Sequence, residues 1–309
     1  MSLGLVIPVR DDSAALNRLL AGARRLGIFD QTVVVDDGSA APVVCTASQT
    51  IRQDHATGPG LARNRGLAEI QTDHVLFFDS DDLILPEIVP LWHSLRGRDF
   101  DFCLFRHVDT RRIGDGHWWQ TPHDDALWRL AGMGGQHLAP VSAQAAPWLA
   151  QTASYPWNKI YRTGFLRGAG ISFPDILLHE DVAPHWQSFA AATTILASDR
   201  VCARHRVTPG GNRMTNMRGP ERLDAIGSLT QLGTSLRPPL RRAFQSFVSE
   251  LFDWIHYHVD PRWHDDLRRA VSRFWRDTLQ PDEEAALIRK DPVMAMRIAL
   301  QMTGGPVPC

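Results

Sequence analysis

The amino-acid sequence predicts an α/β protein with a mostly parallel, doubly wound sheet flanked by helices and followed by a helical C-terminal extension. Short apolar runs alternate with helix-like segments over the first 110 residues, which implies parallel strands joined by right-handed crossovers. Two of these runs, at residues 32–35 and 75–78, lead directly into carboxylates, and in open α/β sheets ligands bind at the carboxyl edge of the strands. From Gly219 onward, apolar residues recur at helical spacing.

Composition limits the classes of protein to consider. The chain has 309 residues, enough for one large α/β domain with an extension or for two domains. Its formal net charge of -1 gives no overall attraction to nucleic acid, so we expect no nucleic-acid partner. The four cysteines form no CxxC pair, and no apolar run resembles a signal peptide or reaches the length of a membrane span. The expected location is cytoplasmic.

The first strand is expected at Leu3–Val9, whose apolar residues suit the centre of a parallel sheet. Residues 10–13 (RDDS) offer caps for a following helix and contain no glycine. A dinucleotide-binding turn or a P-loop needs glycines at this point, so both nucleotide folds are excluded. The next elements are expected as strands at 32–35, 51–57, 74–79 and 100–105, with helices after residue 60 and around 86–96.

The acidic turn Asp79-Ser80-Asp81-Asp82 follows the strand at 74–79. Asp79 and Asp81 face the same way on an extended backbone. Carboxylates this close repel one another, so they need a divalent cation, hydrogen bonds or a raised pKa. Oxygen ligands favour Mg²⁺ or Mn²⁺, which commonly lie between protein carboxylates and substrate phosphates. The turn therefore predicts a metal–phosphate site; the structural alternative is an acidic turn in which Asp82 caps the next helix.

Six segments together resemble, in order and spacing, the successive motifs of family 2 glycosyltransferases. They are VIPV at 6–9, VDDGS at 35–39, GLARNRG at 60–66, FDSDD at 78–82, WNKIYR at 157–162 and LHEDV at 178–182. The resemblance covers roughly residues 3–217. It implies the GT-A fold, a Rossmann-like, mostly parallel sheet flanked by helices, and an inverting sugar transfer from a nucleotide-diphosphate donor.

The resemblance also implies where the donor binds. A carboxylate can accept the imide N–H of uracil and a guanidinium can bond its carbonyls, so a UDP-sugar is expected. Arg10 and Asp11 stand where the family often has Tyr-Asn. Asp79 would contact the ribose and, with Asp81, form the site of the Mn²⁺ or Mg²⁺ ion. The structural alternatives are a turn at 37–39 and solvated surface positions for Arg63 and Lys159. The implied nucleotide-sugar-binding residues are Pro8, Arg10, Asp36, Asp37, Arg63, Asp79, Lys159, Arg206 and Arg213.

The carboxylates of His179-Glu180-Asp181 open a helix-like run. By resemblance, Asp181 is the general base that deprotonates the acceptor hydroxyl, and Glu180 is the second choice. A base opposite the leaving group gives a single displacement with inversion at the anomeric carbon. Acidic residues also favour helix starts, so capping is the structural alternative.

The expected division of the chain is a GT-A domain at 1–217 and a helical extension at 218–309. Within the domain, 1–110 is the nucleotide-binding half. The segment 111–217 is the acceptor side, where Trp118, Trp119 or Trp148 could stack on sugar rings. The amphipathic C-terminal helices predict core packing, or alternatively a partner surface or peripheral association with the inner membrane face. The resemblance to this family also implies a glycan or lipid-linked glycan acceptor in bacterial surface polysaccharide synthesis.

The alternative functions are a sugar-phosphate nucleotidyltransferase and a non-catalytic binding or scaffold protein. A sugar-phosphate nucleotidyltransferase usually has a glycine-rich loop after the first strand, which this chain lacks. A non-catalytic nucleotide-sugar-binding or scaffold protein has no need of Asp81 and Asp181 together.

Overall fold

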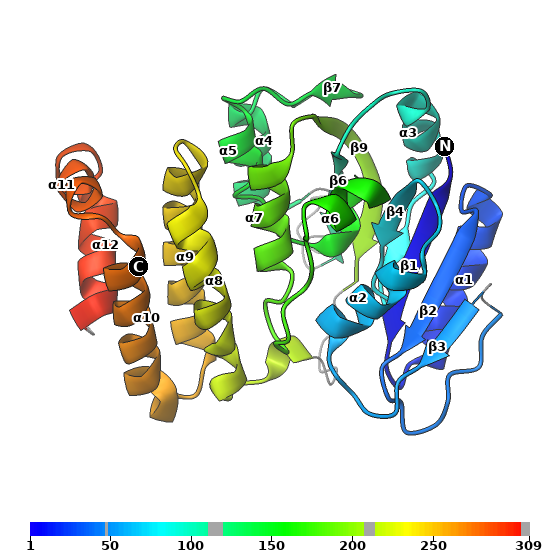
Figure 1. The fold of residues 1–309 in the computed structure, drawn as a ribbon, viewed down its shortest axis with the longest axis horizontal. Helices are drawn as coiled ribbons and strands as arrows, with labels where there is room; N and C mark the ends of the chain where they lie inside the picture. The colour runs from blue at the N-terminus through cyan, green and yellow to red at the C-terminus, as the bar shows by residue number, and fades with distance from the viewer. Residues whose placement is uncertain (47–48, 111–119, 207–213, 304–309) are drawn as a thin grey trace.

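The computed structural model describes residues 1–46, 49–110, 120–206 and 214–303 (Figure 1). Its centre is a nine-stranded sheet in the order β3-β2-β1-β4-β8-β6-β9-β5, with β7 paired to β9. The strands are β1 Leu3–Val9, β2 Gln31–Asp36, β3 Gln49–Arg52, β4 His74–Phe77, β5 Leu83–Ile84, β6 Phe102–Asp109, β7 Ala139–Pro140, β8 Lys159–Arg162 and β9 Ile195–His205. The predicted α/β fold with a mixed, largely parallel sheet is confirmed.

Strand direction explains where the site lies. β1, β2, β3 and β4 are parallel, and β8 runs antiparallel between β4 and β6. Val9 at the end of β1 is paired in register with Asp36 at the end of β2, so the acidic segments after β2 and β4 meet at one edge. At the motif 157–162, a single 3-10 turn, η2 (Pro156–Asn158), leads into strand β8.

Helices cover both faces of the sheet. Along β1, Val6 packs in one hydrophobic cluster and Ile7 in the other, as the period-two alternation of a strand requires. The face with Ile7 is covered by α1 (Ser13–Leu26) and α3 (Ile88–Leu95). The other face is covered by helices that include α2 (Pro59–Glu69), α6 (Thr163–Gly168) and α7 (Val182–Ala191), while α4 (Pro122–Leu130) and α5 (Ala146–Leu149) lie near α7 (Figure 1).

The C-terminal helices share the second core. Trp186 of α7 contacts Phe244 and Phe247, with ring centroids 5.1 and 5.4 Å apart. The same buried cluster runs from Val6 of β1 to Ile298, so the expectation of core packing is confirmed. Among the described residues, no helix is both long and apolar enough to cross a bilayer. The helices are α8 Asp224–Ser235, α9 Leu240–His258, α10 His264–Thr278, α11 Pro281–Lys290 and α12 Pro292–Thr303, and the short turns are η3 Met214–Asn216, η4 Pro220–Arg222 and η5 Pro261–Trp263.

Candidate active site

Arg63 of α2 lies at the centre of the site, between two carboxylates from distant parts of the chain. Its Nη2 donates to Asp79 Oδ1 at 2.6 Å and its Nη1 to Glu180 Oε1 at 2.7 Å. Burial alone would lower the pKa of Arg63, but the charges of Asp79 and Glu180 outweigh burial and raise it. The guanidinium therefore stays charged and joins the acidic turn after β4 to the turn that opens α7.

The packing around Arg63 leaves it little freedom. Its guanidinium lies 5.2 Å from the ring centroid of Phe173. A Cβ atom at Gly60 would come within 3.0 Å of Glu180 Cγ and 3.1 Å of the Pro174 carbonyl oxygen. Only glycine lets the start of α2 approach this closely, which brings Arg63, one helical turn on, within reach of Glu180. This close approach explains why glycine stands at position 60, at the start of the GLAR sequence.

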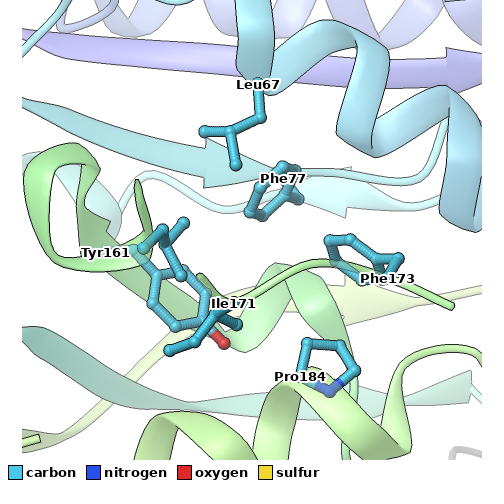
Figure 2. A pocket seen from close by; sticks show the side chains of 7 residues that line it. Leu67, Phe77, Tyr161, Ile171, Phe173 and Pro184 are labelled. Carbon is cyan, nitrogen blue, oxygen red and sulfur yellow. The ribbon is translucent and has the colours of Figure 1, made fainter. Parts of the chain in front are cut away.

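The cavity beside this packing is apolar and does not belong to the donor site. Figure 2 shows Phe77 and Phe173 on one side, and Tyr161, Ile171 and Pro184 on the other. The rings of Phe77 and Phe173 meet edge to face with centroids 5.3 Å apart. The residues that line this small space offer no cluster of polar groups, so the space is not suited to a nucleotide. Phe173, one of the lining residues, packs against the guanidinium of Arg63.

Asp181 lies at the N-cap position of α7, but its side chain makes no capping hydrogen bond. Asp181 therefore occupies the helix start that the structural alternative predicts, but without the hydrogen bond of a side-chain cap. Burial, followed by the neighbouring charge of Glu180, raises the pKa of Asp181 to about 7. Arg63 and Lys159 act in the opposite direction. A carboxylate with a pKa near the operating pH is suited to general-base catalysis.

Lys159 lies in the interior and is 0% exposed. Its Nζ donates to the Tyr155 carbonyl oxygen at 2.9 Å and to Asn158 Oδ1. Burial lowers the pKa of Lys159 to about 7, although the charges of Asp181 and Asp124 raise it. The structural alternative of a surface lysine is wrong. The charge of Lys159 acts on Asp181 from the interior, and its contact with the nucleotide-sugar stays a prediction.

Asp36 and Asp37 organise the loops beside the donor edge. Asp36 accepts hydrogen bonds from the backbone N–H of Ser39 at 3.0 Å and from Arg52 Nη1 at 2.7 Å, and these bonds are among those that lower its pKa against the effect of burial. Asp37 accepts from the N–H groups of Thr57 and Gly58 at 2.7 and 2.9 Å, which fixes the start of α2. A carboxylate oxygen can accept more than one hydrogen bond, so contact of these residues with the base stays a prediction.

Asp82 does not cap the next helix, contrary to the structural alternative. It is 1% exposed and accepts from His205 Nδ1 at 3.1 Å and from the Arg206 N–H at 2.7 Å. The imidazole of His205 belongs to an aromatic group in which Tyr155 and Trp157 stack with centroids 4.4 Å apart. These contacts tie the end of β9 to the acidic turn. The sequence analysis includes Trp157 in a motif but assigns no role to Trp157, His205 or Tyr155.

Asp79 and Asp81 are the candidate metal ligands. Both are partly exposed, in contrast to the buried Asp82. Mg²⁺ and related hard cations are often held by one or two carboxylates together with substrate phosphates, and these two partly exposed aspartates are ligands of that chemical type. Within the described part of the chain, no three or more His, Cys, Asp or Glu side chains form a closed metal site.

The remaining predicted donor residues occupy different positions. Pro8 is buried within β1, opposite Val35. Arg10 is exposed and lies 3.7 Å from the Asp11 carboxylate. Arg206 directly follows β9, and its backbone binds Asp82. Arg213, Trp118 and Trp119 lie outside the described residues, and Trp148 is exposed on α5.

Known proteins share this fold, and one of them shares part of the sequence. S. aureus TarS 1–349, solved in complex with UDP-GlcNAc, superposes with a TM-score of 0.74 at 17% identity, covering 98% of this chain and 89% of that one. A Pyrobaculum calidifontis mannosyltransferase, PcManGT, solved with GDP-Man and Mn²⁺, has a TM-score of 0.54 at 13% identity, covering 97% and 86%. A pre-mycofactocin glycosyltransferase of Mycobacterium tuberculosis is 42% identical over 85 residues, which are 25% of this chain and only 17% of that protein.

The fold is that of the GT-A glycosyltransferases. The model of the family described as "Glycosyl transferase family 2" matches residues 5–140. This match covers the N-terminal part of the chain and confirms the recognition from the motifs that lie in that part.

Proposed function

We propose that this glycosyltransferase moves a sugar, with inversion, from a UDP-sugar to a hydroxyl of a glycan or glycoconjugate acceptor. The observation that carries the proposal is the Arg63 bridge, because it joins Asp79 of the donor-side turn to Glu180, the neighbour of Asp181. This bridge supports the proposal because one buried cation brings together the two turns that carry the proposed donor-side and acceptor-side carboxylates.

The proposed mechanism assigns a separate task to each carboxylate. Asp181 accepts the proton of the acceptor hydroxyl, and its raised pKa makes it a stronger base than an ordinary aspartate. Glu180 and Arg63 hold that turn in place through their ion pair. Asp79 and Asp81 would hold a divalent cation, which neutralises charge on the departing nucleoside diphosphate. With acceptor and donor bound on opposite sides of the anomeric carbon, a single displacement inverts its configuration.

Uridine is the proposed base because Asp36 and Asp37 supply acceptors for its imide N–H. TarS 1–349 has been solved with UDP and with UDP-GlcNAc, which supports this choice. PcManGT has been solved with GDP-Man, so guanosine donors belong in the same test. A lipid-linked glycan acceptor, surface polysaccharide synthesis and peripheral binding at the inner membrane face remain proposals drawn from the family. The division at 217/218 is also a proposal, since the two parts share a core.

The test of donor binding compares the parent protein with Asp81→Ala. In the parent, UDP at about one hundred times its dissociation constant, with Mn²⁺ present, should add roughly 2.7 kcal/mol of stability. The variant should lose the Mn²⁺-dependent part of this gain, because one of the two candidate ligands is missing. Thermal unfolding with UDP, GDP and Mn²⁺, each alone and combined, measures the effect.

Asp99→Ala is the matched control, since Asp99 is exposed and precedes β6 at the opposite edge of the sheet. It should behave as the parent does. An Asp81→Ala protein that binds UDP with the parental Mn²⁺ dependence would remove Asp81 from the metal site.

A further inference from the structure

The turn that carries the proposed base has an unusual backbone at His179, whose φ of +63° lies in the left-handed region. A residue other than glycine rarely adopts this conformation unless its surroundings hold it there. The N–H of Val182 donates to the His179 carbonyl oxygen at 3.2 Å, but this backbone bond does not fix the position of the imidazole ring. Contacts of the His179 side chain can therefore contribute to the position of Glu180 and Asp181, in addition to the Arg63–Glu180 ion pair.

The His179 ring is fixed from the C-terminal helices. Trp254 of α9 meets it edge to face, with ring centroids 5.3 Å apart and planes at 89°. Burial, together with the nearby charges of Arg222 and His258, lowers the pKa of His179 to about 4, so the imidazole is neutral at pH 7. The contact is therefore one of shape and packing, and it links residues 75 positions apart in the sequence.

Trp254 is itself held on more than one side. The Arg222 guanidinium lies 4.7 Å from its ring centroid, and His258 stacks on it with centroids 4.0 Å apart. Arg222 is in turn anchored, since its Nε donates to the Met217 carbonyl oxygen at 2.6 Å. Because Trp254 is 37% exposed, it contributes less to the core than a buried tryptophan does.

We propose that Trp254 is a positioning residue of the active site, which holds His179 in its left-handed conformation and so sets the position of Asp181. The proposal rests on Asp181 being the base of the proposed transfer. It gives the C-terminal helices a part in the reaction, because α9 supplies the ring that braces the turn. Figure 1 shows how this can occur: α8 and α9 lie beside α7, the helix that the turn opens.

The test compares Trp254→Ala, Trp254→Phe and the control Tyr257→Ala. Tyr257 is an exposed aromatic residue of the same helix, and its ring contacts His256. Trp254→Ala should lower kcat about 10- to 100-fold, since small displacements of a catalytic group are costly, with the donor KM changed less than about twofold. Trp254→Phe keeps a ring at the contact and should recover most of the rate. Tyr257→Ala should match the parent.

Hydrogen exchange gives a readout that does not depend on transfer. In Trp254→Ala, amides of residues 178–182 should exchange roughly tenfold faster, while those of α2 stay unchanged. Parental kcat in Trp254→Ala, or an equal loss in Tyr257→Ala, would overturn the proposal, as would unchanged exchange at 178–182. If the parent transfers no sugar from any donor, the proposed function fails instead, and exchange alone decides whether Trp254 braces the turn.

Discussion

Asp181→Asn should lower the rate of sugar transfer by about 10²–10⁴-fold, because loss of general-base assistance typically costs that much. The amide keeps the shape of the side chain and removes its basicity. Donor affinity should change little, since Asp79, Asp81 and Arg63 remain. The melting temperature should stay within about 3 °C of the parent, because Asp181 makes no capping hydrogen bond that the substitution could break.

The pH profile of the parent provides a second readout of the same residue. A base must be ionised, and the pKa of Asp181 is raised to about 7 by burial and by Glu180. The transfer rate should therefore rise with pH up to about 7 and level off above it, whereas an ordinary aspartate would be fully ionised well below pH 6. Normal turnover in Asp181→Asn would remove Asp181 from the mechanism and transfer the role to Glu180.

Arg63→Met should destabilise the protein by about 3 kcal/mol, at the lower end of the cost of breaking a buried ion pair, because Asp79 remains partly exposed. Removal of the cation leaves Asp79, Glu180 and Asp181 as neighbouring carboxylates without their shared partner. Activity per folded molecule should fall as well, since the bridge positions both acidic turns. Denaturant unfolding and turnover on one preparation measure the two effects.

Arg65→Met is the matched control, on the same helix and with the same chemical change. Arg65 is half exposed and pairs with Glu69 at 3.0 Å, and such surface pairs contribute about 0.5 kcal/mol or less. The double variant Arg63→Met/Glu180→Gln should recover part of the lost stability, because it removes one unpaired charge. Equal stability of Arg63→Met and Arg65→Met would contradict the buried-bridge account.

The parts of the fold predicted from sequence are those with strong local signals. The apolar runs of β1, β2 and β4 and the carboxylates that follow two of them are contiguous, and Asp12 caps α1 by accepting from the Ala15 N–H at 2.8 Å, as expected. β8 was missed because it is only four residues long (Lys159–Arg162), with two apolar residues between two basic ones, and so short a segment has no periodicity that distinguishes a strand from a helix. Its strand conformation depends on pairing with β4 and β6.

The site was predictable in its residue types but not in its contacts. Glu180 was identified as an alternative base, yet its ion pair with Arg63 joins positions 117 residues apart. His205 and Asp82 are separated by 123 residues, and no local pattern connects them. The burial of Lys159 likewise follows from the placement of β8 inside the sheet. Such long-range pairings depend on tertiary structure, which local sequence patterns do not specify.

The anomeric configuration of the first product tests the central claim most directly. The parent, supplied with an α-linked UDP-sugar and Mn²⁺, should release UDP and transfer the sugar slowly to water when no acceptor is present. Proton NMR during the first turnovers should show the β-anomer, because a single displacement inverts the anomeric carbon. An α-anomer as the first product would contradict the assignment of Asp181 as a base for direct displacement, and release of sugar phosphate would indicate a different reaction class.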